Sequence, residues 1–154
     1  MDEVFQNRHS VRSFQNKEIK EGELKEILKA AESAPSAGNL KARKIAVVED
    51  LDLKQKLAEA ALGQDFIGEA PVVLVFFALP LVSAQKYRER GKNLYAIQDA
   101  TIATSFAWLQ AVMLGIDGCW VGAFNEEKVK GILNAKEDER PIAILPLGYK
   151  NNQQ

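Results

Sequence analysis

The chain has 154 residues, of which 47% are hydrophobic and 27% charged, and its 20 basic and 21 acidic residues leave a net charge of −1. These values predict one globular domain over residues 1–154 and exclude a global field that would attract nucleic acid or anionic lipid. One cysteine excludes an internal disulfide, and without a basic and apolar leader we expect a cytoplasmic protein. No apolar stretch is long enough to span a bilayer, so we expect no membrane partner.

The single histidine, His9, limits the chemistry further. It cannot assemble a zinc site with one cysteine, and no Gly-x-Ser-x-Gly elbow supports a hydrolase. The spacing of Gly115, Gly118 and Gly122 matches neither a dinucleotide fingerprint nor a phosphate loop with its following lysine. We therefore expect no metal site, and an enzyme with this sequence would need a borrowed cofactor.

The N-terminal residues 2–7 predict a short amphipathic helix that leads into Arg8-His9-Ser10-Val11-Arg12. If this stretch is helical, Arg8 and Arg12 share a face, and their guanidinium groups suit a bound anion. The alternative is a solvated basic patch, which is what charged runs usually form. A helix over 21–34 follows, with apolar residues at helical spacing, and it ends at a loop over 35–39.

The middle of the chain alternates between strand and helix patterns. Residues 45–48 predict a strand, 51–62 a helix, and 72–78 a strand buried on both faces. Residues 83–92 predict a short helix or a mobile arm. The longest helix, 94–114, is apolar on so many sides that we expect it to pack against the sheet and against a second subunit.

The C-terminal part predicts a strand or extended turn at 119–124, a helix at 126–133 capped by Asn125, and a last strand at 141–149. Strands interleaved with helices in this way indicate an α+β or α/β layered domain. The roles of two side chains have two possible interpretations each. Cys119 is a small core residue or a nucleophile, and Gln64 is an exposed glutamine or a contact to a ligand.

Four stretches, in this order, resemble motifs of the FMN-dependent nitroreductases, and the likeness covers nearly the whole chain. They are Arg8–Arg12 before Phe14, the loop from Ala34 to Asn39, Gly115-Ile116-Asp117-Gly118-Cys119-Trp120-Val121-Gly122-Ala123-Phe124, and the ending from Pro141 to Lys150. The resemblance implies an α+β, three-layer fold: a mixed, mostly antiparallel sheet flanked by helices, with a long buried central helix. It also implies a homodimer with FMN at the subunit interface.

By this likeness Arg8 and Ser10 hold the FMN phosphate and ribityl chain, His9 lies beside them, and Arg12 approaches the pyrimidine edge. A cation at that edge stabilises the negative charge of the reduced flavin. The other flavin contacts come from the second subunit's loop and from the backbone beside the ring. They are Pro35, Ser36, Ala37 and Asn39 in the loop, unless it is an ordinary helix-ending turn, and Val121, Gly122 and Ala123 beside the ring. A residue without a side chain lets a flat ring approach the backbone.

Members of this family extend past the Gly148-Tyr149 ending with a tail that supplies basic residues, whereas Lys150 and four polar residues follow here. We therefore expect the phosphate to depend more heavily on Arg8, with Lys150 and Arg43 as further candidates, and FMN affinity to be lower. Asp99 also matches a family position, although we expect its carboxylate to pair with a nearby cation.

The resemblance implies an FMN-dependent oxidoreductase in which NADH or NADPH gives hydride to flavin N5 and a nitroaromatic, quinone or similar acceptor takes it up. The flavin carries the chemistry, so we expect no catalytic side chain. One alternative is a flavin-binding module for storage, sensing or regulation without turnover. A further alternative is a specialised reaction such as reductive dehalogenation.

Overall fold

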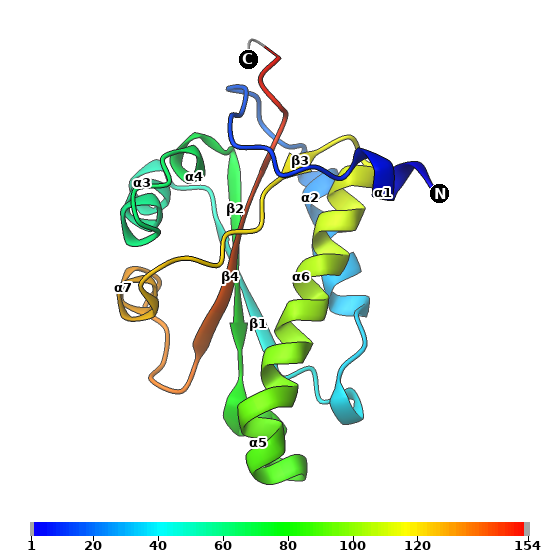
Figure 1. Ribbon diagram of the computed structural model, residues 1–154, viewed down its shortest axis with the longest axis vertical. Coiled ribbons are helices and arrows are strands. Elements are labelled where there is room, and N and C mark those ends of the chain that lie inside the picture. Colours follow the sequence, from blue (N-terminus) through cyan, green and yellow to red (C-terminus); the bar gives the residue numbers. More distant parts are fainter. Residues whose placement is uncertain (1, 153–154) are drawn as a thin grey trace.

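The computed structural model describes residues 2–152 and is organised around a four-stranded sheet (Figure 1). The strands are β1 (Arg43–Val48), β2 (Val72–Ala78), β3 (Asp117–Gly118) and β4 (Arg140–Gly148). Their order is β1-β2-β4-β3, and neighbouring strands are antiparallel. A parallel bridge between Ser10 and Gly118 adds the N-terminal segment at the β3 edge. The predicted mixed, mostly antiparallel sheet is confirmed.

Strand β2 lies inside the sheet, and every one of its residues is buried. Because side chains alternate along a strand, Val73 and Phe77 join the core on one face of the sheet, whereas Leu74 and Phe76 join the core on the other. Both faces of β2 are therefore apolar, as predicted, and each needs a cover of helices.

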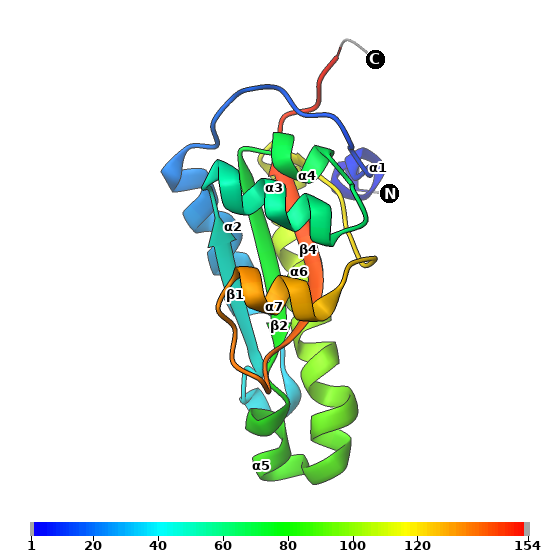
Figure 2. The same ribbon diagram turned by 90° about the vertical axis from the view of Figure 1, so that its left-hand side faces the viewer.

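Helices cover both faces, which gives the predicted three layers (Figures 1 and 2). On one face lie α3 (Leu51–Ala60), α4 (Phe66–Glu69) and α7 (Glu126–Ile132), and on the other lie α2 (Glu21–Ser33) and α6 (Ala96–Met113). The predicted cap of α7 is confirmed, because Asn125 Oδ1 accepts the Lys128 amide at 2.9 Å. No helix within residues 2–152 is both long and apolar enough to cross a membrane.

Helix α6 is the long helix that the sequence predicts, and it turns a face of small residues to the sheet. The fully buried alanines on this face are Ala96, Ala100, Ala103, Ala107 and Ala111. On the outer side Phe106 is 39% exposed and Met113 is 68% exposed. The predicted burial against the sheet is confirmed, and cover of the outer side by a second subunit stays a prediction.

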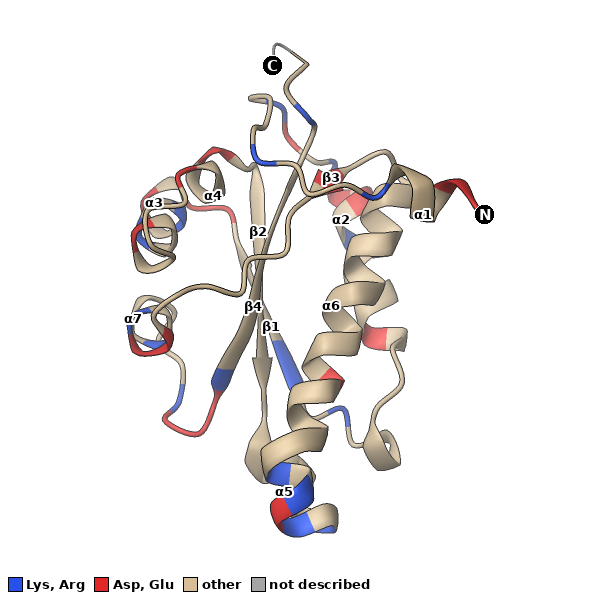
Figure 3. Cartoon of the chain, viewed as in Figure 1, with Lys and Arg blue, Asp and Glu red and all other residues tan. Residues whose placement is uncertain are grey.

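The stretch predicted as a short helix or mobile arm forms helix α5 (Pro80–Arg90). A π-helical turn, η2 (Gly91–Tyr95), follows it and delays the start of α6 to Ala96. Together α5, η2 and the start of α6 make a hairpin that carries a group of basic residues (Figure 3). Gly91 allows the hairpin to close, because a Cβ there would lie 2.6 Å from the Ser83 carbonyl oxygen.

Two short elements complete the chain: the N-terminal helix α1 (Glu3–Asn7) and a 3₁₀ turn, η1 (Ala37–Asn39). The predicted N-terminal helix is confirmed. Of the two alternatives predicted for 119–124, a strand or an extended turn, the strand is wrong, because β3 ends at Gly118 and only Val121 of this range forms a bridge, to Ile144.

Candidate functional site

The basic segment from Arg8 to Arg12 is extended, so the helical arrangement considered from the sequence is wrong. Helix α1 ends one residue before it, and the Val11 amide donates to the Gly118 carbonyl at 3.0 Å. In an extended chain every second side chain points to the same side. Arg8, Ser10 and Arg12 therefore still share one side, while Val11 anchors the segment in the core.

Neither Arg8 nor Arg12 forms an ion pair within residues 2–152. The Arg8 guanidinium carbon lies 4.7 Å from the centroid of the Trp108 ring, on α6. The Trp108 Nε1 is buried and has no hydrogen-bond partner in the described part of the chain. The guanidinium groups without ion pairs and the exposed Ser10 on the same segment suit a bound anion such as a phosphate, whereas the orphaned indole N–H is buried against Gly118.

Gly118 makes this close arrangement possible. A Cβ there would lie 2.8 Å from Leu147 Cδ2, 3.1 Å from the Pro146 carbonyl oxygen and 3.2 Å from Trp108 Nε1. A side chain here would push β3, and with it the paired N-terminal segment, away from β4 and α6. Sequence reasoning missed Trp108, because in an apolar helix a tryptophan cannot be distinguished from the other packing residues.

Cys119 lies directly against the basic segment but is buried. Burial raises the pKa of its thiol, although Arg12, the Ser10 hydroxyl and Arg8 act in the opposite direction. The protonated thiol that results at neutral pH is a poor nucleophile. The interpretation of Cys119 as a small core residue is confirmed.

The segment Val121–Ala123 passes from the sheet to the surface. Val121 exchanges backbone hydrogen bonds with Ile144 at 2.9 and 3.0 Å, and the next two residues are exposed. A Cβ on Gly122 would meet only the Trp120 indole, at 3.5 Å. The chain's own packing therefore does not require glycine here, in contrast to Gly118.

Gln64 fixes the end of this segment. Its Nε2 donates to the carbonyl oxygens of Ala61 at 2.8 Å and Ala123 at 3.2 Å. The interpretation of Gln64 as a merely exposed glutamine is wrong, because the side chain ties the exposed backbone at Ala123 to the loop after α3.

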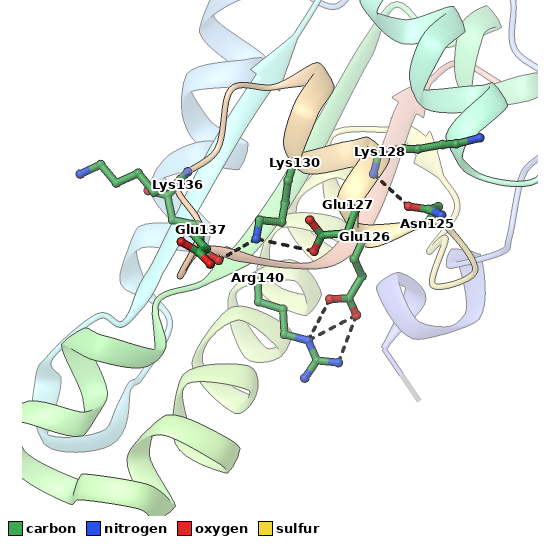
Figure 4. Close-up of polar contacts among 9 residues, drawn as sticks. Asn125, Glu126, Glu127, Lys128, Lys130, Lys136, Glu137 and Arg140 are labelled. Atoms are coloured by element: carbon green, nitrogen blue, oxygen red, sulfur yellow. Dashed lines mark hydrogen bonds and ion pairs between the residues drawn. The ribbon is translucent and has the colours of Figure 1, made fainter.

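A small cleft of about 290 Å³ borders Gly122 and ends at a charged pair that sequence reasoning missed. Arg140 Nε and Nη2 bind the Glu126 carboxylate at 3.1 to 3.3 Å (Figure 4). The apolar lining comes from Ile97, Phe124 and Ile142, among others. Because Arg140 and Glu126 are distant in sequence, no local motif could have revealed the pair.

The two further phosphate candidates have different positions. Lys150 lies in the bridge with Phe14, its amide donates to Asp117 Oδ2 at 3.0 Å, and its side chain is exposed at the same end of the sheet as Arg12. Arg43 is buried, and its Nη2 donates to three carbonyl oxygens at the end of α2. The prediction that Arg43 binds phosphate is therefore wrong, because its guanidinium caps a helix.

The loop with Pro35, Ser36, Ala37 and Asn39 lies near the start of α6. Asp99, on α6, accepts the Ala37 amide at 3.1 Å and the Ala42 amide at 3.3 Å through its two carboxylate oxygens. The loop borders a cleft of about 470 Å³ that is also lined by Tyr95 and Gln98. The predicted pairing of Asp99 with a cation is wrong, because the buried carboxylate is satisfied by backbone N–H groups.

One chain does not bring all predicted site residues together. The segment with Arg8, His9, Ser10 and Arg12 pairs with β3, and Arg8 lies over Trp108, in the C-terminal half of α6. The loop 35–39 is hydrogen-bonded to Asp99, near the start of that helix. The segment 121–123 lies farther along β4, because Val121 pairs with Ile144, and Gly122 shares a cleft with Ile97. Asp99 and Trp108, which mark the two ends, are separated by nine residues, or roughly 14 Å of helix rise. The arginine segment and the loop 35–39 are therefore two separate half-sites.

A larger cleft of about 680 Å³ begins at Phe14, two residues after Arg12, and lies between the segment 14–19 and helices α3 and α4. Its wall includes Lys54, whose Nζ donates to the Ala70 carbonyl oxygen at 2.7 Å. Burial lowers the pKa of Lys54, although Glu49 and Asp50 oppose that shift. The lysine is engaged with the end of α4 and is therefore not free to bind a ligand in this cleft.

The layered α+β fold and two guanidinium groups that form no ion pair within the described residues suit a protein that binds an anionic ligand. The chain belongs to the nitroreductase family, whose model matches residues 5–64 and 60–149. It is 34% identical to a Thermus thermophilus protein named NADH dehydrogenase, over 92% of this chain and 82% of the relative.

Two further relatives agree with this membership. A Bacillus subtilis protein named FMN reductase (NAD(P)H) is 28% identical over 97% of this chain and 66% of its own length. The solved structure of an FMN-dependent nitroreductase from Clostridium difficile superposes with a TM-score of 0.85 at 26% identity, covering 98% of this chain and 88% of the other.

Proposed function

We propose that this chain is an FMN-dependent oxidoreductase that passes hydride from NADH or NADPH to a nitroaromatic, quinone or similar acceptor. The observation that carries the proposal is the pairing of the segment with Arg8, Ser10 and Arg12 to β3 at Gly118, with neither guanidinium group in an ion pair within residues 2–152. FMN and NAD(P)H are supported by the family match and by the names of the relatives.

The donor set at this edge fits FMN, which supplies the centre that accepts and returns hydride. Arg8 and Ser10 would bind the phosphate, with His9 beside them and the exposed Lys150 as a further cation. Arg12 would face the pyrimidine edge, where a positive charge favours reduction. The backbone of Val121–Ala123 would lie along the ring, held at its end by Gln64.

The remaining flavin contacts, Pro35, Ser36, Ala37 and Asn39, lie at the opposite end of α6, so we propose that they come from a second copy of the chain. The exposed Phe106 and Met113 on the outer side of α6 support a homodimer, because burial of such side chains favours association. Each 1–154 chain would then be one FMN-binding domain with two half-sites.

We assign no side chain to acid or base catalysis. The only described thiol, Cys119, is buried, and no group of three or more metal-ligating side chains occurs among residues 2–152. The chain's task is to bind, orient and polarise the cofactor and to keep one side of the site open to exchange of reductant and acceptor.

The purified protein, incubated with FMN and freed of excess ligand, tests the proposal by its absorption spectrum and by anaerobic addition of NADH or NADPH. We expect a yellow protein that either reductant bleaches and that a quinone or nitroaromatic recolours. Colour that persists with both reductants would point instead to a flavin-binding module without turnover. A protein that takes up no FMN would contradict the proposal altogether.

A further inference from the structure

The tip of the α5–η2 hairpin carries four basic side chains within seven residues: Lys86, Arg88, Arg90 and Lys92. All four are exposed, and they form the basic group around α5 in Figure 3. Within residues 2–152 none of them forms an ion pair. The one carboxylate in the stretch, Glu89, accepts a hydrogen bond from Asn93 Nδ2 at 3.2 Å. The tip is therefore a local field of uncompensated positive charge on a chain whose net charge is only −1.

One of these cations, Arg90, is held in place by its side-chain contacts, and another, Arg88, has a strained backbone. Arg90 Nε donates to the Tyr95 hydroxyl at 3.0 Å, and its guanidinium carbon lies 5.4 Å from the centroid of that ring. Tyr95 in turn meets Tyr87 edge to face, with centroids 5.1 Å apart. Arg88 sits at a φ of 50° and a ψ of −132°, a backbone conformation that favours glycine. An arginine kept at a strained turn, next to an arginine ordered by an aromatic pair, points to a binding role.

The tip borders the half-site at the start of α6. A Cβ placed on Gly38 would lie 2.7 Å from the Tyr87 hydroxyl and 3.2 Å from Lys86 Nζ, so α5 packs directly on the loop 35–39. Tyr95 also lines the 470 Å³ cleft formed with that loop. In the proposed dimer this loop would contact the flavin held by the other chain, so the cations would lie beside the path of the reductant.

We propose that this basic tip binds the 2′-phosphate of NADPH and makes the protein prefer NADPH to NADH; the inference rests on the proposed function. The two reductants differ only in a phosphate monoester, which adds about two negative charges near neutral pH. Arginine forks match phosphate oxygens, and an arginine is a usual way to accommodate this group. The structural alternative is that Arg88 and Arg90 only stabilise the C-terminus of α5.

The test compares kcat/KM for NADPH and NADH in the FMN-loaded protein and in an Arg88→Ala/Arg90→Ala variant. We expect the unmodified protein to prefer NADPH by about tenfold or more, and the variant to lose most of that preference through KM, because each charged contact is worth about a factor of ten. The matched control is Lys25→Ala/Lys29→Ala on α2, which removes the same charge from an exposed face and should leave the ratio unchanged.

A second variant and a second measurement distinguish weaker NADPH binding from a folding defect in the double variant. Arg88→Gly removes one cation while relieving the strained φ, so it should be at least as stable as the parent and still bind NADPH more weakly. Adenosine 2′,5′-bisphosphate, titrated against the FMN-loaded protein, should bind more tightly than ADP, and more weakly after Arg88→Gly.

Equal use of NADH and NADPH, or an unchanged ratio in both variants, would overturn this inference and leave the proposed function intact. A protein that neither reductant reduces would overturn the proposed function, and this inference with it. A drop in stability without any change in the NADPH to NADH ratio would assign the two arginines to the helix end alone.

Discussion

The two ends of helix α6 carry the two halves of the proposed site, and they use charge in opposite ways. At the Trp108 end, backbone pairing with Gly118 holds the N-terminal segment, and its cations stay unpaired. At the other end, Asp99 is buried, and its carboxylate accepts hydrogen bonds from two backbone amides of the loop after α2. The cations at the Trp108 end are available to a ligand, whereas the carboxylate at the Asp99 end fixes the conformation of a loop. The role of a motif residue therefore does not follow from its place in the motif until its partners are known.

The largest effect we expect is on the end that shapes the backbone. Asp99→Ala leaves the N–H groups of Ala37 and Ala42 without an acceptor, and we predict a loss of about 3 kcal/mol in the free energy of unfolding, measured with urea. Asp99→Asn keeps an oxygen acceptor and should lose less. Equal stability of Asp99→Ala and the parent would show that the loop does not depend on this carboxylate.

Two glycines, Gly118 in β3 and Gly122 at the surface beyond it, separate packing from ligand binding. Gly118→Ala places a methyl group 2.8 Å from Leu147 Cδ2 and should cost about 2 kcal/mol of stability. Gly122→Ala meets only Trp120 at 3.5 Å, so stability should stay within about 0.5 kcal/mol while FMN binds more weakly. Unfolding curves and FMN titrations of the two variants provide the comparison. A Gly122→Ala protein with the parent's FMN affinity would remove this backbone from the site.

The charge-presenting role of Arg8 is tested by Arg8→Ala. Loss of charge-assisted bonds to phosphate should weaken FMN binding by about tenfold, equivalent to about 1.4 kcal/mol, in a fluorescence titration. Lys17→Ala is the matched control, because Lys17 is exposed in the same N-terminal segment but lies over the Tyr149 ring. If both variants lose affinity equally, the effect is one of general charge and not of a phosphate contact.

The smallest expected effect on stability concerns Glu139, a carboxylate at neither end of α6 that serves as a reference for Asp99. Burial alone would raise the pKa of Glu139, but bonds from Lys44 Nζ at 2.7 Å and the Lys136 amide at 3.0 Å outweigh it, so the pKa lies below its usual value. Such a group stabilises the fold above its unfolded pKa of about 4.3 and loses that contribution as pH falls through the folded pKa.

Glu139→Gln should therefore show a shallower fall in stability than the parent between about pH 5 and pH 3, measured as the urea midpoint at each pH. At pH 7 the variant should be the less stable of the two. Parallel pH profiles for the two proteins would show that the ion pair of Glu139 makes no pH-dependent contribution to stability.

Much of the fold follows from local pattern. The apolar run of β2, the helix before Pro35 and the long helix α6 are all found where the sequence predicts them, because period and breakers are local properties. The extended state of Arg8–Arg12 was not predicted, since it depends on pairing with Gly118, far along the chain.

The candidate site shows the same division. The residue types at Arg8, Ser10 and Gly122 could be read from motifs, but the partners that define them could not. Trp108 beneath Arg8, the capping role of Arg43 and the Arg140–Glu126 pair arise only when distant elements meet. Tertiary packing, which the sequence pattern does not encode locally, decides which cations remain free to bind a ligand.

The central claim, that the two ends of α6 meet across two chains to hold one flavin, has a direct test by mixing. One variant, Arg8→Ala/Arg12→Ala, lacks the charge-presenting end, and another, Ala37→Trp, blocks the cleft at the opposite end. Each alone should bind little FMN. Refolded together in equal amounts, they should regain about one quarter of the parent's FMN sites, because half of the dimers are hybrids with one intact site. No recovery, with dimers present, would contradict a site shared between chains.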